Sequence, residues 1–243
     1  MNRPVTVSAY GLYRHFGTRT AVRGIDLEVK HGEVLGFLGP NGAGKTTVMR
    51  MLTGTLAPSA GRIEICGIDL LRKPQDAKAR IGYLPEIAPL YRELTVSEYL
   101  RFTARLHRIE HLDIRPSVDK AMQRCGLSNS GQRLIGSLSK GYQQRVGIAQ
   151  AIIHNPDVII LDEPTAGLDP NQIREIRNLI RELGTNRAIV LSTHILSEVE
   201  NVCDQVHILH EGRTVFTDSL KALRQKATSL EEVFIRSTMK DDL

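Results

Sequence analysis

Short apolar runs alternate along the chain with segments in which apolar residues recur at helical spacing. The runs EVLGFLG, GRIEIC, RIGYLP, DVIILD and AIVLST have the length and composition of buried strands. The segments TTVMRMLTG, QIREIRNLIREL and ILSEVENVCD follow several of these runs and have the period of an α-helix. Strands that alternate with helices predict a mostly parallel sheet covered by helices, so the expected fold class is α/β.

Two regions depart from this alternation. Before Gly39, the runs VTVSAYGLY and TAVRGIDLEV, together with the later hairpin-like VHILHEGRTVF, predict an antiparallel β edge. From residue 87 to residue 145 the pattern becomes helical: Thr95 and Glu98 have capping-box spacing at the start of one helix, and SVDKAMQRCGL follows as a second. We therefore expect an α/β core with an antiparallel β subdomain over 1–86 and 146–220, a helical subdomain over 87–145 and a C-terminal tail over 221–243.

The composition is that of a globular protein. The chain has 243 residues, of which 41% are apolar, and MNRPVTVSAY does not have the order of a secretory signal. No apolar stretch reaches the roughly 20 residues that a membrane-spanning helix needs. The three cysteines are scattered singly, which favours reduced thiols over a disulfide framework or a zinc site. The net charge of +5 is spread along the chain and does not by itself indicate nucleic acid.

The loop GPNGAGKTT joins an apolar run to a helical segment. A strand that turns through glycines into a helix presents unpaired backbone N–H groups at the positive end of the helix dipole, where phosphate binds. In this G-x-x-x-x-G-K-[ST] pattern, Lys45 would reach the β- and γ-phosphates and Thr46 would ligate Mg²⁺. The predicted nucleoside triphosphate site consists of Gly39, Pro40, Asn41, Gly42, Ala43, Gly44, Lys45, Thr46 and Thr47.

A second, acidic site is expected because the metal and the attacking water need ligands. In VIILDEP, four apolar residues lead to Asp162 and Glu163 at the end of a buried strand, where open α/β sheets bind their ligands. Asp162 would hold Mg²⁺ through water, and Glu163 would orient and deprotonate the attacking water. The alternative is that the two acids only cap the following segment.

Between these two sites lies LSKGYQQR, Leu138 to Arg145, and with this segment the chain resembles the ATP-binding subunit of ABC transporters. A serine before a helix is also a common N-cap, and the N–H groups exposed there can bind phosphate, so one surface can do both. The resemblance implies a head-to-tail dimer with two ATP molecules at the interface, formed by two copies of the chain or with a homologous ATPase subunit. The segment that would close over the γ-phosphate of the other subunit is Ser139, Lys140, Gly141, Tyr142 and Gln143.

Further motifs extend the resemblance over nearly the whole chain. AGLDP resembles the D-loop of the family, and Asp169 before a proline is also a good helix N-cap. STH places His194 after a buried strand, where it resembles the switch histidine that senses the γ-phosphate; a lone histidine in that place can also be structural. YRHFG offers Phe16 as the ring that stacks on adenine, with Tyr13 as the alternative, and rings near strand ends are also common in cores.

IGYLPE resembles the Q-loop, with Glu86 where glutamine is the commoner residue. A carboxylate there would attract Mg²⁺ more strongly than an amide and would put a like charge near Glu163; the alternative is a solvated loop acid. YLPE, LTVSEYL and LEEVFIR resemble the subgroup in which two such subunits drive a separately encoded permease, mostly exporters of drugs, polysaccharides, ions or lipids. LEEVF would also suit an ordinary docking helix.

The resemblance therefore implies an ATPase that closes as a dimer on two ATP molecules and reopens upon hydrolysis. The helical subdomain and the loop around Glu86 would carry that movement to the permease. The expected cofactors are ATP and Mg²⁺, and the expected location is the cytoplasmic face of the cell membrane, as a peripheral subunit with no nucleic acid partner.

Two other classes of protein compete with this interpretation. A soluble ABC-type ATPase acting on ribosomes or DNA is the alternative, but such proteins typically carry two cassettes in one chain or a very long coiled-coil insertion. A non-catalytic nucleotide sensor would lack a base such as Glu163.

Overall fold

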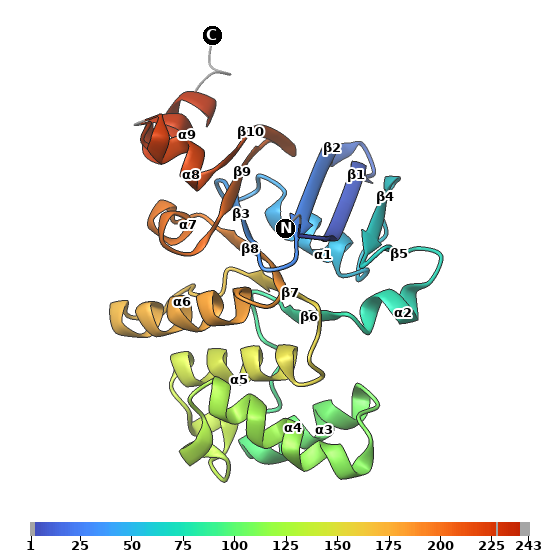
Figure 1. Ribbon diagram of the computed structural model, residues 1–243, viewed down its shortest axis with the longest axis vertical. Coiled ribbons are helices and arrows are strands. Elements are labelled where there is room, and N and C mark those ends of the chain that lie inside the picture. Colours follow the sequence, from blue (N-terminus) through green and yellow to red (C-terminus); the bar gives the residue numbers. More distant parts are fainter. Residues whose placement is uncertain (1–2, 227, 239–243) are drawn as a thin grey trace.

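The computed structural model describes residues 3–226 and 228–238, which form two sheets with helices packed around them (Figure 1). The strands are β1 (Val5–Phe16), β2 (Arg19–Lys30), β3 (Val34–Leu38), β4 (Ala60–Ile65), β5 (Ile68–Asp69), β6 (Ile81–Leu84), β7 (Val158–Asp162), β8 (Ala188–Thr193), β9 (Gln205–His210) and β10 (Arg213–Ser219). The α-helices are α1 (Lys45–Leu52), α2 (Pro74–Lys78), α3 (Val96–Leu106), α4 (His111–Arg124), α5 (Lys140–Ile152), α6 (Pro170–Gly184), α7 (Leu196–Val202), α8 (Leu220–Gln225) and α9 (Leu230–Thr238). Residues 1–2 of the predicted core and residues 227 and 239–243 of the predicted tail lie outside the described residues.

The six-stranded sheet has the order β10-β9-β3-β8-β7-β6. Its pairings are parallel except for the antiparallel pair of β9 and β10 at one edge. The strands β3, β7 and β8 are buried at every position, which explains why they are continuous apolar runs rather than alternating ones. The predicted α/β fold with a mostly parallel central sheet is confirmed.

Two predicted strands pair differently from what their sequences suggested. GRIEIC forms β4, which pairs antiparallel with β1 and β5 instead of joining the parallel sheet. VHILHEGRTVF forms β9 and β10, which extend the six-stranded sheet instead of the edge made by β1 and β2. The reason is physical: local pattern determines that a segment is a strand, whereas its neighbours depend on pairing across long stretches of sequence.

The side chains of β3 alternate between two hydrophobic clusters on opposite faces of the six-stranded sheet. Leu35 and Phe37 belong to the cluster shared with α1 and the four-stranded sheet, whereas Val34 and Leu38 belong to the cluster shared with α5, α6 and α7. This alternation is the two-residue period of a strand buried on both faces. Burial on both faces holds the strand ends in place, and those ends carry the predicted site.

The helices α3, α4 and α5 form the lower end of the molecule in Figure 1. α3 begins with the predicted capping box, in which the Glu98 carboxylate accepts a hydrogen bond from the Thr95 N–H at 2.8 Å. The second predicted helix begins earlier than expected, at His111. α5 lies against β6 so closely that a Cβ at Gly82 would collide with the carbonyl oxygen of Ala151.

The predicted boundary between residues 145 and 146 falls inside α5, which joins the helical region to the sheet. The division into subdomains therefore stays a prediction. Among residues 3–226 and 228–238, no helix combines the length and the apolar character that crossing a membrane requires.

Candidate functional site

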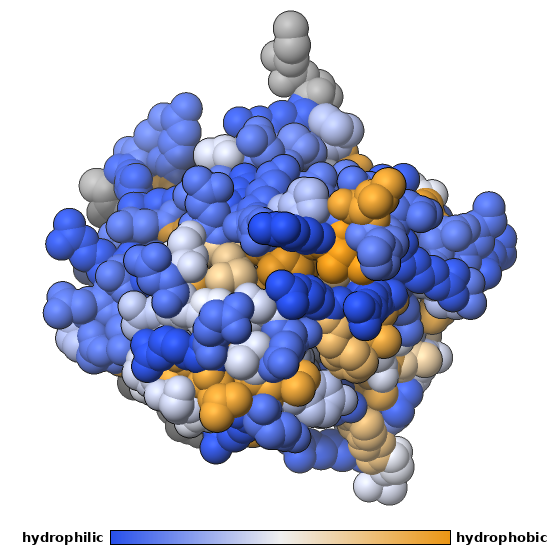
Figure 2. Space-filling model, turned by 90° about the horizontal axis from the view of Figure 1, so that it is seen from below, coloured by the Kyte–Doolittle hydropathy of each residue, from blue (hydrophilic) through white to orange (hydrophobic). Residues whose placement is uncertain are grey.

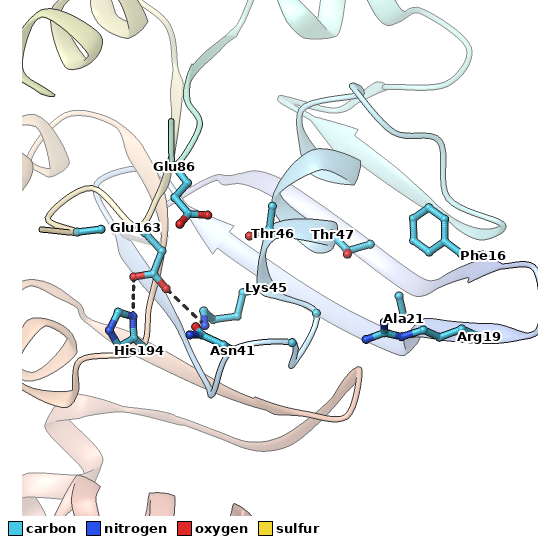
Figure 3. Close-up of a pocket in the computed structure, with 13 residues that line it drawn as sticks. Phe16, Arg19, Ala21, Asn41, Lys45, Thr46, Thr47, Glu86, Glu163 and His194 are labelled. Carbon is cyan, nitrogen blue, oxygen red and sulfur yellow. Dashed lines mark hydrogen bonds and ion pairs between the residues drawn. The ribbon is translucent and has the colours of Figure 1, made fainter. Parts of the chain in front are cut away.

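Four parallel strands of the six-stranded sheet end at one edge, and each leads into a loop with a predicted site residue. β3 leads to Gly39, β6 to Glu86, β7 to Glu163 and β8 to His194. Adjacent parallel strands bring their carboxyl ends together, and ligands of open α/β sheets bind at such edges. A cavity of about 630 Å³ opens there (Figure 3) and is lined by Phe16, Arg19, Ala21, Asn41, Gly42, Gly44, Lys45, Thr46, Thr47, Glu86, Glu163, Ala166 and His194.

The loop after β3 enters α1 through a left-handed residue. Gly44 is the N-cap of α1 with φ of 105°, and a Cβ there would lie 2.8 Å from the carbonyl oxygen of Ala21. Glycine is required because other residues avoid this conformation and have no room here. The backbone N–H groups of the first helical turn have no partners within the helix, so they are available to a ligand in the cavity.

The ammonium group of Lys45 is buried at the mouth of this loop. Its Nζ donates to the carbonyl oxygen of Gly39 at 2.7 Å and to that of Pro40 at 3.3 Å. It also lies 3.4 Å from Oε1 of Glu163. A buried ammonium needs such partners, and phosphate oxygens in the cavity would supply stronger ones.

Asp162 lies behind the loop, and its two carboxylate oxygens differ. Oδ1 accepts hydrogen bonds from the hydroxyl of Thr46, at 3.3 Å, and from the hydroxyl of Ser192. Oδ2 is buried and has no hydrogen-bond partner among the described residues. Burial raises the pKa of this carboxyl, while the two hydroxyl donors act in the opposite direction. A buried carboxylate oxygen without a partner, next to a threonine hydroxyl, fits a hard cation with oxygen ligands.

The carboxylate of Glu163 is held between a lysine and a histidine. Oε2 lies 3.0 Å from Nδ1 of His194, and Oε1 faces Lys45. Figure 3 shows these contacts as dashed lines, with Glu86 on the same side of the cavity. The backbone of Glu163 has φ of 49°, a strained conformation that its N–H stabilises by donating to the carbonyl and hydroxyl oxygens of Ser192 at 3.2 and 3.1 Å.

The two candidate rings for adenine lie in different places. Phe16 lines the cavity and is 46% exposed, and the guanidinium of Arg14 lies 4.6 Å from the centre of its ring. Tyr13 lines a separate hollow with Arg23 and Gly24. This geometry favours Phe16 over Tyr13.

Several predicted site residues lie outside the cavity. Ala43 lines a neighbouring hollow, and Lys140 and Gln143 line a third one together with Glu86. Asp169 forms the predicted N-cap of α6, since its Oδ1 accepts from the N–H groups of the second and third helical residues, both at 3.0 Å.

The start of α5 also lies away from the cavity. Ser139, Gly141 and Tyr142 are not among the cavity's lining residues. Ser139 occupies the N-cap position of α5, but within the part of the chain that the structure describes its hydroxyl makes no capping hydrogen bond. The predicted side-chain cap is therefore wrong, although the backbone conformation of a cap is present.

Three polar contributors were not predicted from the sequence. Arg19 lines the cavity near Phe16, Ser192 holds both Asp162 and Glu163, and Thr193 precedes His194. The sequence did contain a signal for Ser192 and Thr193, because they are two hydroxyl residues at the end of an apolar strand that reaches the site. Arg19 had no such signal, since it lies at the start of β2, far from the phosphate loop in sequence.

Comparison with known proteins gives consistent matches. The pattern of the family described as "ABC transporter" matches residues 22–166. The bacitracin transport ATP-binding protein BcrA of Bacillus licheniformis is 41% identical over 204 residues, covering 83% of this chain and 66% of that protein. The Nod factor export ATP-binding protein I of Paraburkholderia xenovorans is 36% identical over 211 residues, covering 86% of this chain and 69% of that protein.

A solved structure of an ATP-binding subunit of an ABC transporter superposes with a TM-score of 0.85 at 30% identity. The superposition covers 96% of this chain and 99% of that one. The chain spans about two thirds of the length of the bacitracin and Nod factor relatives.

Proposed function

The chain is an ATP-binding, ATP-hydrolysing subunit of the ABC transporter family, and from this premise we propose which residues bind and hydrolyse ATP. The observation that carries the proposal is the convergence of four strand ends on one cavity, which gathers the glycine loop, Lys45, Glu163 and His194. The triphosphate lies along the loop with its terminal phosphates at Lys45. The adenine stacks on Phe16 at the other end of the cavity.

Mg²⁺ would be held by the hydroxyl of Thr46 and by Asp162 through water, and Glu86 would be a further oxygen ligand from the cavity wall. The unpartnered Oδ2 of Asp162 supports this proposal. No group of three or more His, Cys, Asp or Glu side chains that could hold a metal occurs among the described residues. Magnesium bound together with a nucleotide usually has one or two protein ligands and takes its other ligands from water and phosphate oxygens. When bound, the ion neutralises charge on the phosphates.

Hydrolysis uses Glu163 as the base that accepts the proton of the attacking water. The pairing of its carboxylate with Lys45 and His194 supports this role, because the phosphates would draw Lys45 away and leave the carboxylate for water. His194 orients Glu163 through Nδ1. The side chain of His194 is 48% exposed, so it can also reach a phosphate oxygen.

Two chains bind two ATP molecules head to tail, as the exposed start of α5 suggests. Ser139, Lys140 and Tyr142 are exposed and lie outside the cavity of their own chain. In the dimer, the segment 139–143 of one chain completes the phosphate site of its partner. Asp169, which is exposed at the start of α6, lies at the same interface.

A membrane permease binds the face of the helical region that adjoins Glu86. Ile87 is 84% exposed, and Tyr91 packs edge-on against Phe102 at 5.7 Å between ring centres, which extends an apolar surface from the loop onto α3. Figure 2 shows apolar patches among charged side chains at this end of the molecule. The name of the bacitracin relative supports transport as the process driven, and the name of the Nod factor export relative supports export as its direction. The subunit then sits on the cytoplasmic face of the membrane.

The catalytic assignment is tested with Glu163→Gln. Because an amide fills the same space but cannot accept the proton, turnover falls by at least about a hundredfold while ATP affinity stays within about threefold. The ATP-bound variant accumulates as a dimer in size-exclusion chromatography. Turnover above about a tenth of wild type would remove Glu163 from this role.

The permease contact is tested by sedimentation with membranes of the source cells and with protein-free vesicles of anionic lipid. The chain binds the cell membranes, and Ile87→Asp weakens that binding because it places a charge on an apolar contact. Leu112→Asp is the matched control, since Leu112 is an equally exposed apolar residue, at 87%, on α4. Equal binding by both variants, or binding to protein-free vesicles, contradicts the proposed contact.

A further inference from the structure

One buried carboxylate lies just behind the site without touching the cavity. Glu198 belongs to α7 and is 3% exposed. Its Oε2 accepts a hydrogen bond from the hydroxyl of Thr193 at 2.6 Å, and its Oε1 accepts one from the hydroxyl of Thr165. Nη2 of Arg177, on α6, lies 4.0 Å from Oε1. Both oxygens are therefore engaged, and each is engaged by a different segment of the chain.

Thr165 lies in the loop that carries Glu163, and Thr193 is the last residue of β8, at the start of the loop that carries His194. Thr165 follows Glu163 in a turn in which the N–H of Ala166 donates to the carbonyl oxygen of Glu163 at 3.1 Å. Thr193 directly precedes His194, and its hydroxyl also accepts from the N–H of the residue after His194, at 3.0 Å. The residues on both sides of His194 are therefore held by the hydroxyl of Thr193, which donates to Glu198 and accepts from the N–H of Ile195.

We propose that Glu198 is a positioning residue that holds Glu163 and His194 at hydrogen-bonding distance; this rests on the proposed roles of those two residues. The carboxylate clamps the loop after β7 to the last residue of β8, while the contact of Glu163 with His194 at 3.0 Å joins the loops after these two strands inside the cavity. Reacting groups lose much of their effect when displaced by about 1 Å, so a rigid link behind them has a direct consequence for rate.

The chemistry of the cluster argues for positioning rather than for simple filling of space. A buried carboxylate costs free energy unless its oxygens are hydrogen-bonded, and an apolar residue would fill the same volume without that cost. An apolar residue, however, could not bind two hydroxyls in fixed directions. The guanidinium of Arg177 extends the clamp to α6, whose N-cap is Asp169.

The test measures ATP turnover per bound ATP for the purified full chain, with bound ATP determined by equilibrium dialysis. Glu198→Ala lowers kcat by about 10- to 100-fold, as expected for misplaced reacting groups. ATP affinity changes by less than about threefold, because the glycine loop and Lys45 are untouched. Glu198→Gln loses less than Glu198→Ala, since the amide keeps the shape and one acceptor. Glu200→Ala, an exposed acid on the same helix, is the matched control and keeps wild-type turnover.

A second variant removes only one bond of the clamp and serves if Glu198→Ala does not fold. Thr193→Val lowers kcat in the same way as Glu198→Ala, whereas Thr103→Val leaves it unchanged, although Thr103 is also buried and hydrogen-bonded. The double variant Thr193→Val with Glu198→Ala turns over within about threefold of Glu198→Ala alone, because both changes break one link.

The inference is overturned if Glu198→Ala and Thr193→Val keep kcat within about twofold of wild type, if ATP affinity falls in parallel, or if their effects multiply. Glu163→Gln and His194→Ala are measured in the same series. If these two variants keep turnover, the proposed catalytic assignment fails and the positioning role falls with it. If they lose turnover while the Glu198 and Thr193 variants do not, only the positioning role is wrong.

Discussion

The helices α1 and α5 both follow glycine-containing loops, and their first turns have opposite surroundings. At α1, Lys45 is 6% exposed and is bound by two carbonyl oxygens and by Glu163 within a cavity of the same chain. At α5, Ser139 and Lys140 are exposed, and the hydroxyl of Ser139 forms no cap within the described residues. The chain therefore encloses one helix N-terminus and leaves the other to solvent.

The start of α5 packs against α6 on its other side. Gly141 lies so close to Gln172 of α6 that a Cβ there would be 2.5 Å from the side-chain amide carbon. The side chain of Arg145 binds that of Glu175, also on α6. These two contacts join the first two turns of α5 to α6, the helix that begins after Asp169. The difference between the two helices is what the proposed head-to-tail dimer requires, in which α1 of one copy and α5 of the other would each supply half of a phosphate site.

Lys45→Ala and Lys140→Ala change the first residue of each helix and test the comparison most strongly. Removing the buried, paired ammonium of Lys45 costs about 3 kcal/mol, so ATP affinity falls by about a hundredfold and turnover is lost. Lys140→Ala leaves the ATP affinity of the single chain within about twofold, because this lysine lies outside its own cavity. Isothermal titration with ATP measures both variants. Equal losses of ATP affinity would show that the starts of α1 and α5 contribute alike to the ATP site of the single chain.

A mixing experiment tests whether the halves come from opposite chains. Lys45→Ala and Ser139→Arg should each abolish turnover alone, since every site of either homodimer lacks one half. Heterodimers of the two variants contain one intact site, so the mixture recovers a fraction of wild-type turnover. The control is a chain carrying both substitutions, mixed with each single variant. A mixture as inactive as its parents, when heterodimers are present, means that the trans arrangement is wrong or that both sites must fire together.

Glu86 lies between the starts of α1 and α5, because it lines both the cavity at α1 and the hollow that contains Lys140. Glu86→Gln keeps hydrolysis within about tenfold, since a neutral oxygen can replace a charged one at a water-rich metal. Glu86→Ala is slower and needs more Mg²⁺, because it removes the oxygen. ATPase rates against Mg²⁺ concentration compare these variants with wild type. Three superimposable curves would show that Glu86 is an incidental loop acid.

Phe16→Ala has the smallest expected effect and tests where adenine binds in the cavity at α1. Stacking of a base on an aromatic ring contributes about 1 kcal/mol or slightly more, so ATP affinity falls by about five- to tenfold. Tyr13→Ala changes affinity by less than about twofold, because Tyr13 lies in a separate hollow. Competition with a fluorescent ATP analogue measures both. The opposite order would transfer the adenine contact to Tyr13.

The sequence alone determined the features that depend on neighbouring residues. The glycine loop, the acids after an apolar run and the capping box at Thr95 each occupy a few consecutive positions, so their local conformation and chemistry follow from residue types and spacing. The alternation of strands and helices likewise predicted the parallel sheet, because buried strands and amphipathic helices have different periods.

Tertiary structure decided every feature that depends on residues far apart in the chain. The pairing of β4 and of β9 with their neighbours, the choice of Phe16 over Tyr13 as the ring at the cavity, and the contribution of Ser192 are of this kind. Glu198 is the clearest example: in ILSEVENVCD it is one acid of an amphipathic helix, and only packing places its oxygens between Thr165 and Thr193. The physical reason is that a hydrogen bond across strand ends depends on how the sheet orders its strands, and that order is set by burial and pairing over the whole chain.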